Sequence, residues 1–91
     1  MSDVARVFRV EGRVQGVGFR WWTRQQAEEL GVRGTVRNLP DGSVEVTAAG
    51  KEEQLMKLEH RLKEGPLTSH VSSVRSTPGT DGGAIGFVIS G

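Results

Sequence analysis

The sequence predicts an α+β fold, in which two helices cover one face of a mostly antiparallel sheet. Segments with strand-like and helix-like hydrophobic periodicity alternate as strand, helix, strand, strand, helix and strand, and a short strand ends the chain. Two β-α-β units joined by a hairpin are typical of the split β-α-β, or ferredoxin-like, two-layer sandwich. The strands alternate between apolar and polar residues, which indicates that the second face of the sheet is partly solvated.

The composition fits a single domain that spans residues 1–91. The net charge of +1 gives no electrostatic basis for binding nucleic acid or a membrane surface. The chain has no cysteine, so its fold does not depend on disulfides or on thiolate metal ligands. No apolar run is long enough for a signal peptide or a membrane span, and we therefore expect a cytoplasmic protein. A chain of this size with a full set of elements can be a monomer.

Residues 5–11 form the first predicted strand, because their side chains alternate between two faces, with Phe8 and Val10 on one and Val7 and Arg9 on the other. Three glycines then fall within seven residues of the stretch Gly12-Arg13-Val14-Gln15-Gly16-Val17-Gly18-Phe19-Arg20. Because glycine allows positive φ and close approach to the main chain, such a turn can direct several N–H groups into one anion-binding concavity. The alternative is that this loop binds nothing, since its glycine spacing matches neither the dinucleotide fingerprint nor the P-loop.

Residues 21–30 form the first predicted helix, with Trp21, Ala27 and Leu30 on its buried face and Gly31 as its stop. No Ser, Thr, Asp or Asn stands at its N-cap, so no side chain satisfies its first N–H groups. An anion can satisfy them at the positive end of the helix dipole. Arg20 adds a permanent charge with a planar fork that suits phosphate oxygens.

Residues 32–39 and 43–49 form the next two predicted strands, which the turn Pro40-Asp41-Gly42 joins as a hairpin. Asn38 falls on the same strand face as Val36, where an apolar residue would be expected. It either begins the turn, as asparagine often does, or places a polar group beside the candidate anion loop. The first and third strands of a split β-α-β sheet are adjacent, which can bring the loop near the hairpin.

Three leucines at helical spacing predict a second helix over residues 51–64, which Gly65-Pro66 ends. A weaker strand is predicted over residues 70–77, and a last short strand over residues 85–89. The apolar residues of the last strand share one face: Ile85, Phe87 and Ile89. Several basic side chains outside the loop are expected to be solvated: Arg9, Arg13, Arg24, Arg33 and Arg37.

Two ordered motifs resemble the signatures of the acylphosphatase family. The first is Val10-Glu11-Gly12-Arg13-Val14-Gln15-Gly16-Val17-Gly18-Phe19-Arg20. The second is Gly34-Thr35-Val36-Arg37-Asn38, followed by Gly42, Val44 and Gly50. With the lengths and order of the elements, the resemblance spans nearly the whole chain. The sequence departs from the family pattern at Thr35, where an aromatic residue is usual, and at its end, which lacks the aromatic residue that is frequent there.

The resemblance implies a ferredoxin-like sandwich that hydrolyses acyl phosphates, which are carboxyl–phosphate mixed anhydrides, to a carboxylate and inorganic phosphate. It implies that Arg20 binds the phosphoryl group and that Asn38 holds the attacking water. It also implies a phosphate cradle made of Gln15, Gly16, Val17, Gly18 and Phe19. The scheme requires no metal and no cofactor, and inorganic phosphate or sulfate should compete with the small-molecule acyl phosphate.

Two alternative hypotheses, in which the protein binds a ligand without catalysis, remain open beside the hydrolase hypothesis. The first is a ferredoxin-like module that binds phosphate or an acyl phosphate without hydrolysing it. The second is an RNA-binding module, which needs aromatic residues on the open face of the central strands and a basic surround. The first predicted strand offers only Phe8, and the third offers no aromatic residue.

Overall fold

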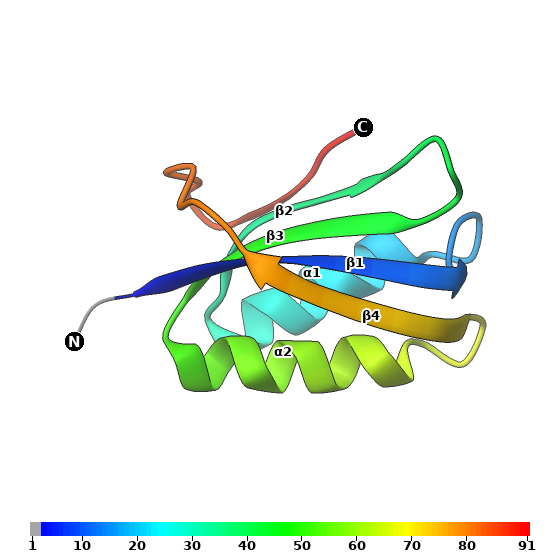
Figure 1. Cartoon of the computed structure of the whole chain (residues 1–91), viewed down its shortest axis with the longest axis horizontal. Helices are drawn as coiled ribbons and strands as arrows, with labels where there is room; N and C mark the ends of the chain where they lie inside the picture. The colour runs from blue at the N-terminus through cyan, green and yellow to red at the C-terminus, as the bar shows by residue number, and fades with distance from the viewer. Residues whose placement is uncertain (1–2) are drawn as a thin grey trace.

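The computed structural model of the chain describes residues 3–91. These residues form β1 (Val4–Arg13), α1 (Phe19–Leu30), β2 (Arg33–Asn38), β3 (Val44–Gly50), α2 (Glu52–Glu64), β4 (His70–Pro78) and β5 (Phe87–Ile89). Both helices lie on one face of the sheet, which leaves the other face open to solvent (Figure 1). The predicted two-layer arrangement is therefore confirmed.

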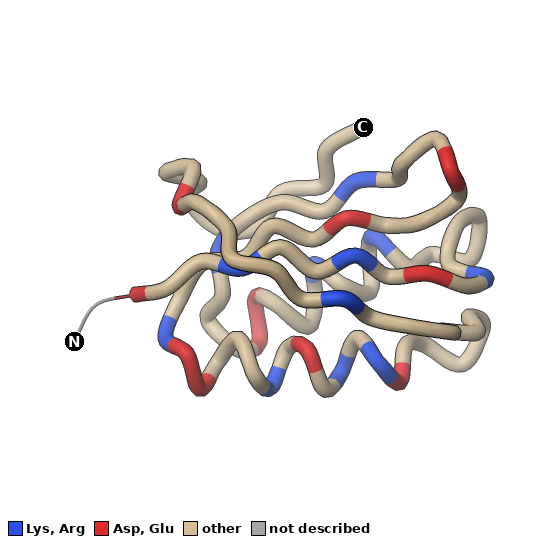
Figure 2. The backbone as a smooth tube through the Cα atoms, in the orientation of Figure 1, with Lys and Arg blue, Asp and Glu red and all other residues tan. Residues whose placement is uncertain are grey.

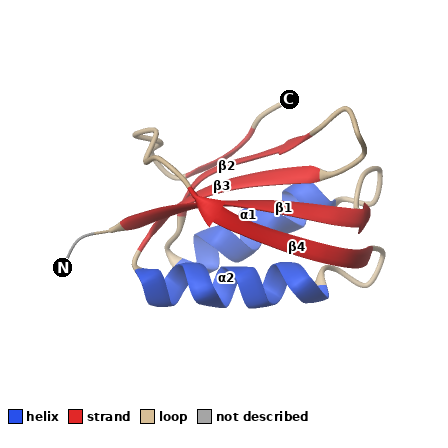
Figure 3. Ribbon diagram, viewed as in Figure 1, coloured by secondary structure: helices blue, strands red, loops and turns tan. Residues whose placement is uncertain are grey.

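The sheet has the strand order β4-β1-β3-β2-β5. Figure 3 labels β4, β1, β3 and β2, which follow one another in this order. β3 pairs antiparallel with β1 on one side and with β2 on the other, as the predicted hairpin requires. β4 pairs antiparallel with β1, and β5 alone pairs parallel, with β2. A β-bulge between Glu11 and Gly12 lets β1 continue to Arg13, so the loop before α1 is limited to residues 14–18.

The core lies between the sheet and the two helices. Val46 of β3 is opposite Phe8 of β1 and opposite Val36 of β2, so these three buried side chains form one cross-strand row. The predicted leucine stripe of α2 is fully buried against this layer and consists of Leu55, Leu58 and Leu62. Burial of a large aliphatic side chain contributes about 1.5–3 kcal/mol, which makes this apolar layer the main source of stability.

One predicted core position and the predicted start of the last strand are wrong. α1 begins at Phe19, two residues earlier than expected, and its buried face carries Phe19, Thr23 and Ala27. Trp21 consequently lies on another face of the helix and is 59% exposed. Ile85 is also exposed, because β5 begins only at Phe87, which is buried.

Charges of both signs alternate over the strands and helices (Figure 2). Most of the arginines that were expected in solvent lie at the surface in ion pairs. These pairs are Arg9–Asp41, Arg24–Glu28, Arg33 with both Asp3 and Asp81, and Arg37–Glu45. Exposed pairs of this kind contribute little to stability.

Asp81 ties the loop between β4 and β5 to β2. Its carboxylate accepts a hydrogen bond from the Gly83 N–H (2.9 Å) and pairs with Arg33. The Gly83 amide first, and the Arg33 guanidinium second, lower the pKa of Asp81 below its ordinary value. Because the folded pKa is lower than the unfolded one, this carboxylate stabilises the fold above the unfolded pKa, and the effect is lost as pH falls through the folded pKa.

We therefore expect Asp81→Asn to lower the Tm slightly near neutral pH, since the group is solvent-exposed. The difference from the wild-type protein should disappear in acid, well below the ordinary aspartate pKa of about 3.9. Thermal unfolding of both proteins over a pH series measures this. A Tm difference that persists unchanged in strong acid would contradict it.

Candidate active site

The two predicted motifs meet at one end of the sheet. β1 and β2 both run antiparallel to β3, so their carboxyl ends lie at the same edge. The loop of residues 14–18 leaves β1 at this edge, and Asn38 is the last residue of β2. Val44 of β3 is opposite both Val10 and Asn38, so Asn38 continues a row of core-facing residues toward the loop.

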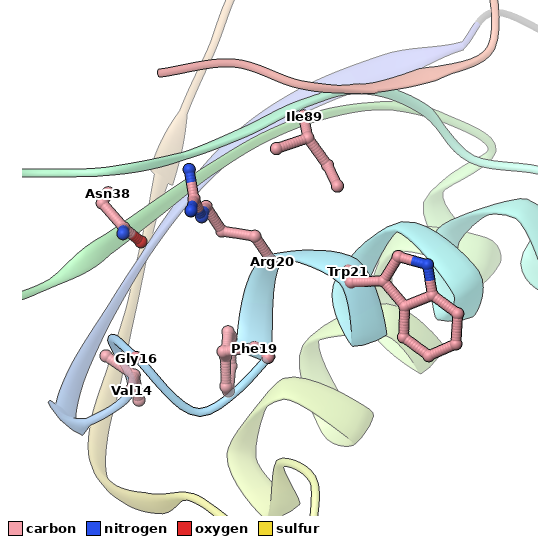
Figure 4. A pocket seen from close by; sticks show the side chains of 8 residues that line it. Val14, Gly16, Phe19, Arg20, Trp21, Asn38 and Ile89 are labelled. Carbon is pink, nitrogen blue, oxygen red and sulfur yellow. The ribbon is translucent and has the colours of Figure 1, made fainter.

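A cavity of about 170 Å³ opens at this edge. It is lined by Val14, Gly16, Gly18, Phe19, Arg20, Trp21, Asn38 and Ile89 (Figure 4). These residues come from the loop after β1, the first turn of α1, the end of β2 and the end of β5. Since a water molecule occupies about 30 Å³ of liquid, the cavity has room for a small tetrahedral anion and a water.

The N-terminus of α1 supplies main-chain donors beside the cavity. Its N-cap is Gly18, no side chain caps it, and its first turn contains no acidic residue. The first hydrogen bond of the helix runs from the Trp22 N–H to the Gly18 carbonyl (3.0 Å), so the preceding amides have no acceptor within the helix. These amides lie at the positive end of the helix dipole, which favours an anion.

Glycine is required in the loop by conformation and not by crowding. Gly16 and Gly18 have φ values of 73° and 78°, in the left-handed region that other residues rarely adopt. A Cβ at either position would meet no atom within 4 Å. The left-handed backbone turns the chain sharply from β1 into α1 and leaves the loop open toward the cavity.

Arg20 is a cation without a counter-ion. It lies in the first turn of α1, and its side chain extends toward Asn38 (Figure 4). It belongs to no ion pair within residues 3–91, although the next arginine along the helix, Arg24, pairs with Glu28. A positive charge at the positive end of a helix dipole is unfavourable without a nearby anion. The site is therefore electrostatically suited to a negatively charged ligand.

Asn38 contributes a buried acceptor without a donor. Its Oδ1 is buried and has no hydrogen-bond partner among the described residues. The carboxamide points toward the Arg20 guanidinium, and both groups line the same cavity (Figure 4). Because a buried polar atom without a partner costs about 1–3 kcal/mol, a water or a ligand that donates a hydrogen bond here would be bound favourably.

Only some of the residues predicted for the phosphate site line the cavity in the structure. Four of the residues predicted for the phosphate site line the cavity: Gly16, Gly18, Phe19 and Arg20. The side chain of Val17 is half-buried and packs against the core. The side-chain amide of Gln15 is directed to the hairpin, where it donates to the carbonyls of Leu39 (2.8 Å) and Ser43 (2.9 Å).

Three lining residues were not among those predicted for the site: Val14, Trp21 and Ile89. Val14 directly precedes the predicted cradle in the chain. The position of Trp21 could have been predicted from the sequence. A helix with Gly18 as its N-cap buries Phe19, Thr23 and Ala27 and therefore leaves Trp21 on another face. For Ile89 there was no local signal, because it reaches the cavity only through the parallel pairing of β5 with β2. Thr35, one of the two departures from the family pattern, alternates with the buried residues of β2. It therefore lies on the open face of the sheet, away from the cavity.

Within residues 3–91, no group of three or more His, Cys, Asp or Glu side chains is placed to hold a metal ion. His60 and His70 are both exposed and do not line the cavity. In the same part of the chain, no helix has the length and apolar character needed to cross a membrane.

Comparison with known proteins agrees with this geometry. A family model described as Acylphosphatase matches residues 6–89. The acylphosphatase of Mycolicibacterium vanbaalenii is 48% identical over 84 residues, which cover 92% of this chain and 90% of that protein. The acylphosphatase of Thermus thermophilus is 47% identical over 78 residues, which cover 86% of this chain and 89% of that protein.

Solved structures give the same result. An acylphosphatase from Coxiella burnetii superposes with a TM-score of 0.91 at 36% identity, covering 97% of this chain and 93% of that chain. An acylphosphatase from Bacillus subtilis also has a TM-score of 0.91, at 34% identity, with 96% and 98% covered. From its sequence, its fold and these relatives, the chain belongs to the acylphosphatase family of enzymes.

Proposed function

We propose that this protein hydrolyses acyl phosphates to a carboxylate and inorganic phosphate. In this proposal, Arg20 and the amides of the loop and first helical turn hold the phosphoryl group, and Asn38 holds the attacking water. One observation carries the assignment: an unpaired guanidinium, uncapped helix amides and an unpaired buried carboxamide oxygen surround the same cavity. Membership of the acylphosphatase family supports the substrate class.

The chemistry needs few catalytic groups because the leaving group is good. The conjugate acid of a carboxylate has a pKa of about 4, so the carboxylate departs without a proton from a general acid. The water oxygen bonds to phosphorus, and the bond between phosphorus and the acyl oxygen breaks with its electron pair on the carboxylate. The water proton passes to an oxygen of the phosphoryl group.

The main work of the protein is to stabilise charge. Phosphoryl transfer spreads negative charge over three equatorial oxygens, and catalysis depends largely on positioning and electrostatics. The amides at the start of α1 and the Arg20 guanidinium are fixed donors that can face these oxygens without reorganisation. Within the part of the chain that the structure describes, no side chain caps these amides and the first helical hydrogen bond begins only at the Trp22 N–H, so an anion need not displace a protein acceptor.

Asn38 is suited to hold water and not to deprotonate it. Its Oδ1 can accept a hydrogen bond from the water, and its amide nitrogen can donate one. In-line attack puts the nucleophile and the leaving group on opposite sides of phosphorus. The acyl group would then lie on the side of the cavity away from Asn38, where Ile89 and Trp21 are found (Figure 4).

The experiment that tests the function is release of inorganic phosphate from benzoyl phosphate by the purified protein, with and without a chelator. We expect turnover that the chelator does not reduce. We also expect inorganic phosphate and sulfate to inhibit competitively, because both would occupy the cradle. Phosphate binding without turnover would instead support the binding-module alternative, and noncompetitive inhibition would place the anion elsewhere.

Arg20→Ala is expected to abolish phosphate binding and to lower kcat/KM by about 1,000-fold or more, the range known for arginines that stabilise phosphoryl transfer. Steady-state kinetics and phosphate titration measure the two effects. Arg24→Ala removes an arginine one helical turn further on, outside the cavity, and should behave like the wild-type protein. Equal losses in the two variants would mean that general surface charge matters and not the site.

Asn38→Ala is expected to lower kcat by about 100-fold with little change in KM or in phosphate affinity. The reason is that the change misplaces the water and leaves the phosphate donors intact. A pH–rate profile of the wild-type protein provides a second check, since a water activated in this way needs no enzymic base that titrates near neutral pH. Normal turnover by the variant would remove Asn38 from the mechanism.

A further inference from the structure

We propose that Gln15 is a positioning residue that sets the gap between the anion loop and Asn38. Its side chain bridges the loop to the β2–β3 hairpin, and it acts on the reaction only through the placement of the Asn38 carboxamide. This inference rests on the proposed function. It assigns to the Gln15 side chain a role different from direct contact with phosphate.

The contact is specific and uses both hydrogens of one amide group. The Gln15 Nε2 donates to the carbonyl oxygen of Leu39 at 2.8 Å and to that of Ser43 at 2.9 Å, in a part-buried position. Leu39 follows Asn38 directly in the chain. A shift of the Leu39 carbonyl therefore rotates or displaces the neighbouring Asn38, so the bridge transmits the loop position to the carboxamide.

The same two residues close the hairpin turn. The Leu39 N–H donates to the Ser43 carbonyl (2.8 Å), and the Gly42 N–H donates to the Leu39 carbonyl (3.1 Å). Each carbonyl that accepts from Gln15 thus also accepts a hydrogen bond within the turn. Gln15 consequently holds the turn at the two points where the hairpin closes.

Asn38 needs this second support because the sheet holds it on one side only. On the β3 side, its register partner is Val44. On the β5 side, the strand pairing stops at Val36, which is opposite Ile89, and the Ser90 N–H makes the last contact with the Val36 carbonyl (2.8 Å). An error of about 1 Å in the position of a reacting group can reduce the rate about 100-fold, so the bridge can matter for turnover.

A different tether holds the other part of the same loop. The hydroxyl of Thr68, in the segment between α2 and β4, donates to the Val17 carbonyl (2.9 Å), and within residues 3–91 it has no hydrogen bond to the hairpin. This arrangement offers a matched comparison. Removing the Thr68 hydroxyl loosens the loop alone, whereas removing the Gln15 donors separates the loop from Asn38.

The first test is amide hydrogen exchange on Gln15→Met, which keeps the length of the side chain but has no donor. We expect faster exchange of the Leu39 and Gly42 amides than in the wild-type protein. Gln26→Met, which removes a contact to Arg61 between the helices (2.8 Å), should leave these amides unchanged. Unchanged exchange of the hairpin in Gln15→Met overturns the proposal. Should that variant not fold, Gln15→Asn replaces it, since a shorter carboxamide cannot reach both carbonyls.

The second test is a double-mutant cycle with benzoyl phosphate. We expect Gln15→Met to lower kcat by about 10- to 100-fold, with KM and the inhibition constant of inorganic phosphate within about threefold of the wild-type values. In the Asn38→Ala background, the same change should lower kcat by less than about twofold, because the group that it positions is already absent. The effect of Thr68→Val should be the same in both backgrounds.

If Gln15→Met lowers kcat by the same factor with and without Asn38, the proposal is overturned. A merely structural role of Gln15 predicts that the effects of the two mutations on the activation free energy add. The cycle also separates this inference from the function on which it rests. Wild-type protein that releases no phosphate would refute the proposed function, and the exchange experiment alone would then decide whether Gln15 holds the hairpin. If the wild-type protein releases phosphate and the effects of Gln15→Met and Asn38→Ala on kcat are independent, only the proposed role of Gln15 is refuted.

Discussion

The antiparallel pairing of β3 with both β1 and β2 is the constraint on which the rest of the structure depends. It places the carboxyl ends of β1 and β2 at one edge, where the loop and Asn38 meet. The buried row of Phe8, Val46 and Val36 holds the register. A slip of one residue would expose this row and turn Asn38 to the other face of the sheet, so the apolar core and the site depend on the same alignment.

The cavity concentrates hydrogen-bonding groups that lack partners. Among residues 3–91 most arginines are paired with carboxylates, whereas Arg20 is not, and the helix that follows the loop has no side-chain cap at its N-terminus. Asn38 adds an acceptor that is buried and unpaired. Each of these features destabilises the free protein, and the leucine and valine core offsets the cost. All of them become favourable contacts when an anion and a water are bound, which is the property of a preorganised site.

A reaction with a good leaving group suits so small a scaffold. In the proposed reaction no general acid is needed for the departing carboxylate, so the protein would supply mainly fixed donors and a fixed water. Helices and strands provide more precise positions than loops, and both proposed catalytic residues lie at the ends of such elements. The loop and the hairpin turn lie outside these elements, and the Gln15 bridge joins these two segments directly.

Local physical preferences allowed much of this protein to be predicted from sequence. Hydrophobic periodicity identified the strands and the leucine stripe of α2, turn chemistry identified the hairpin, and the two motifs identified Arg20 and Asn38 as site candidates. Trp21 was wrongly assigned to the buried face of its helix, because the helix begins two residues earlier than predicted and buries a different stripe. Ile85 was wrongly assigned to the last strand, which begins only at Phe87. Only the tertiary structure decided that Ile89 lines the cavity and that Gln15 binds the hairpin. Those contacts join residues far apart in the chain, and they exist only once strand order and register have brought the segments together.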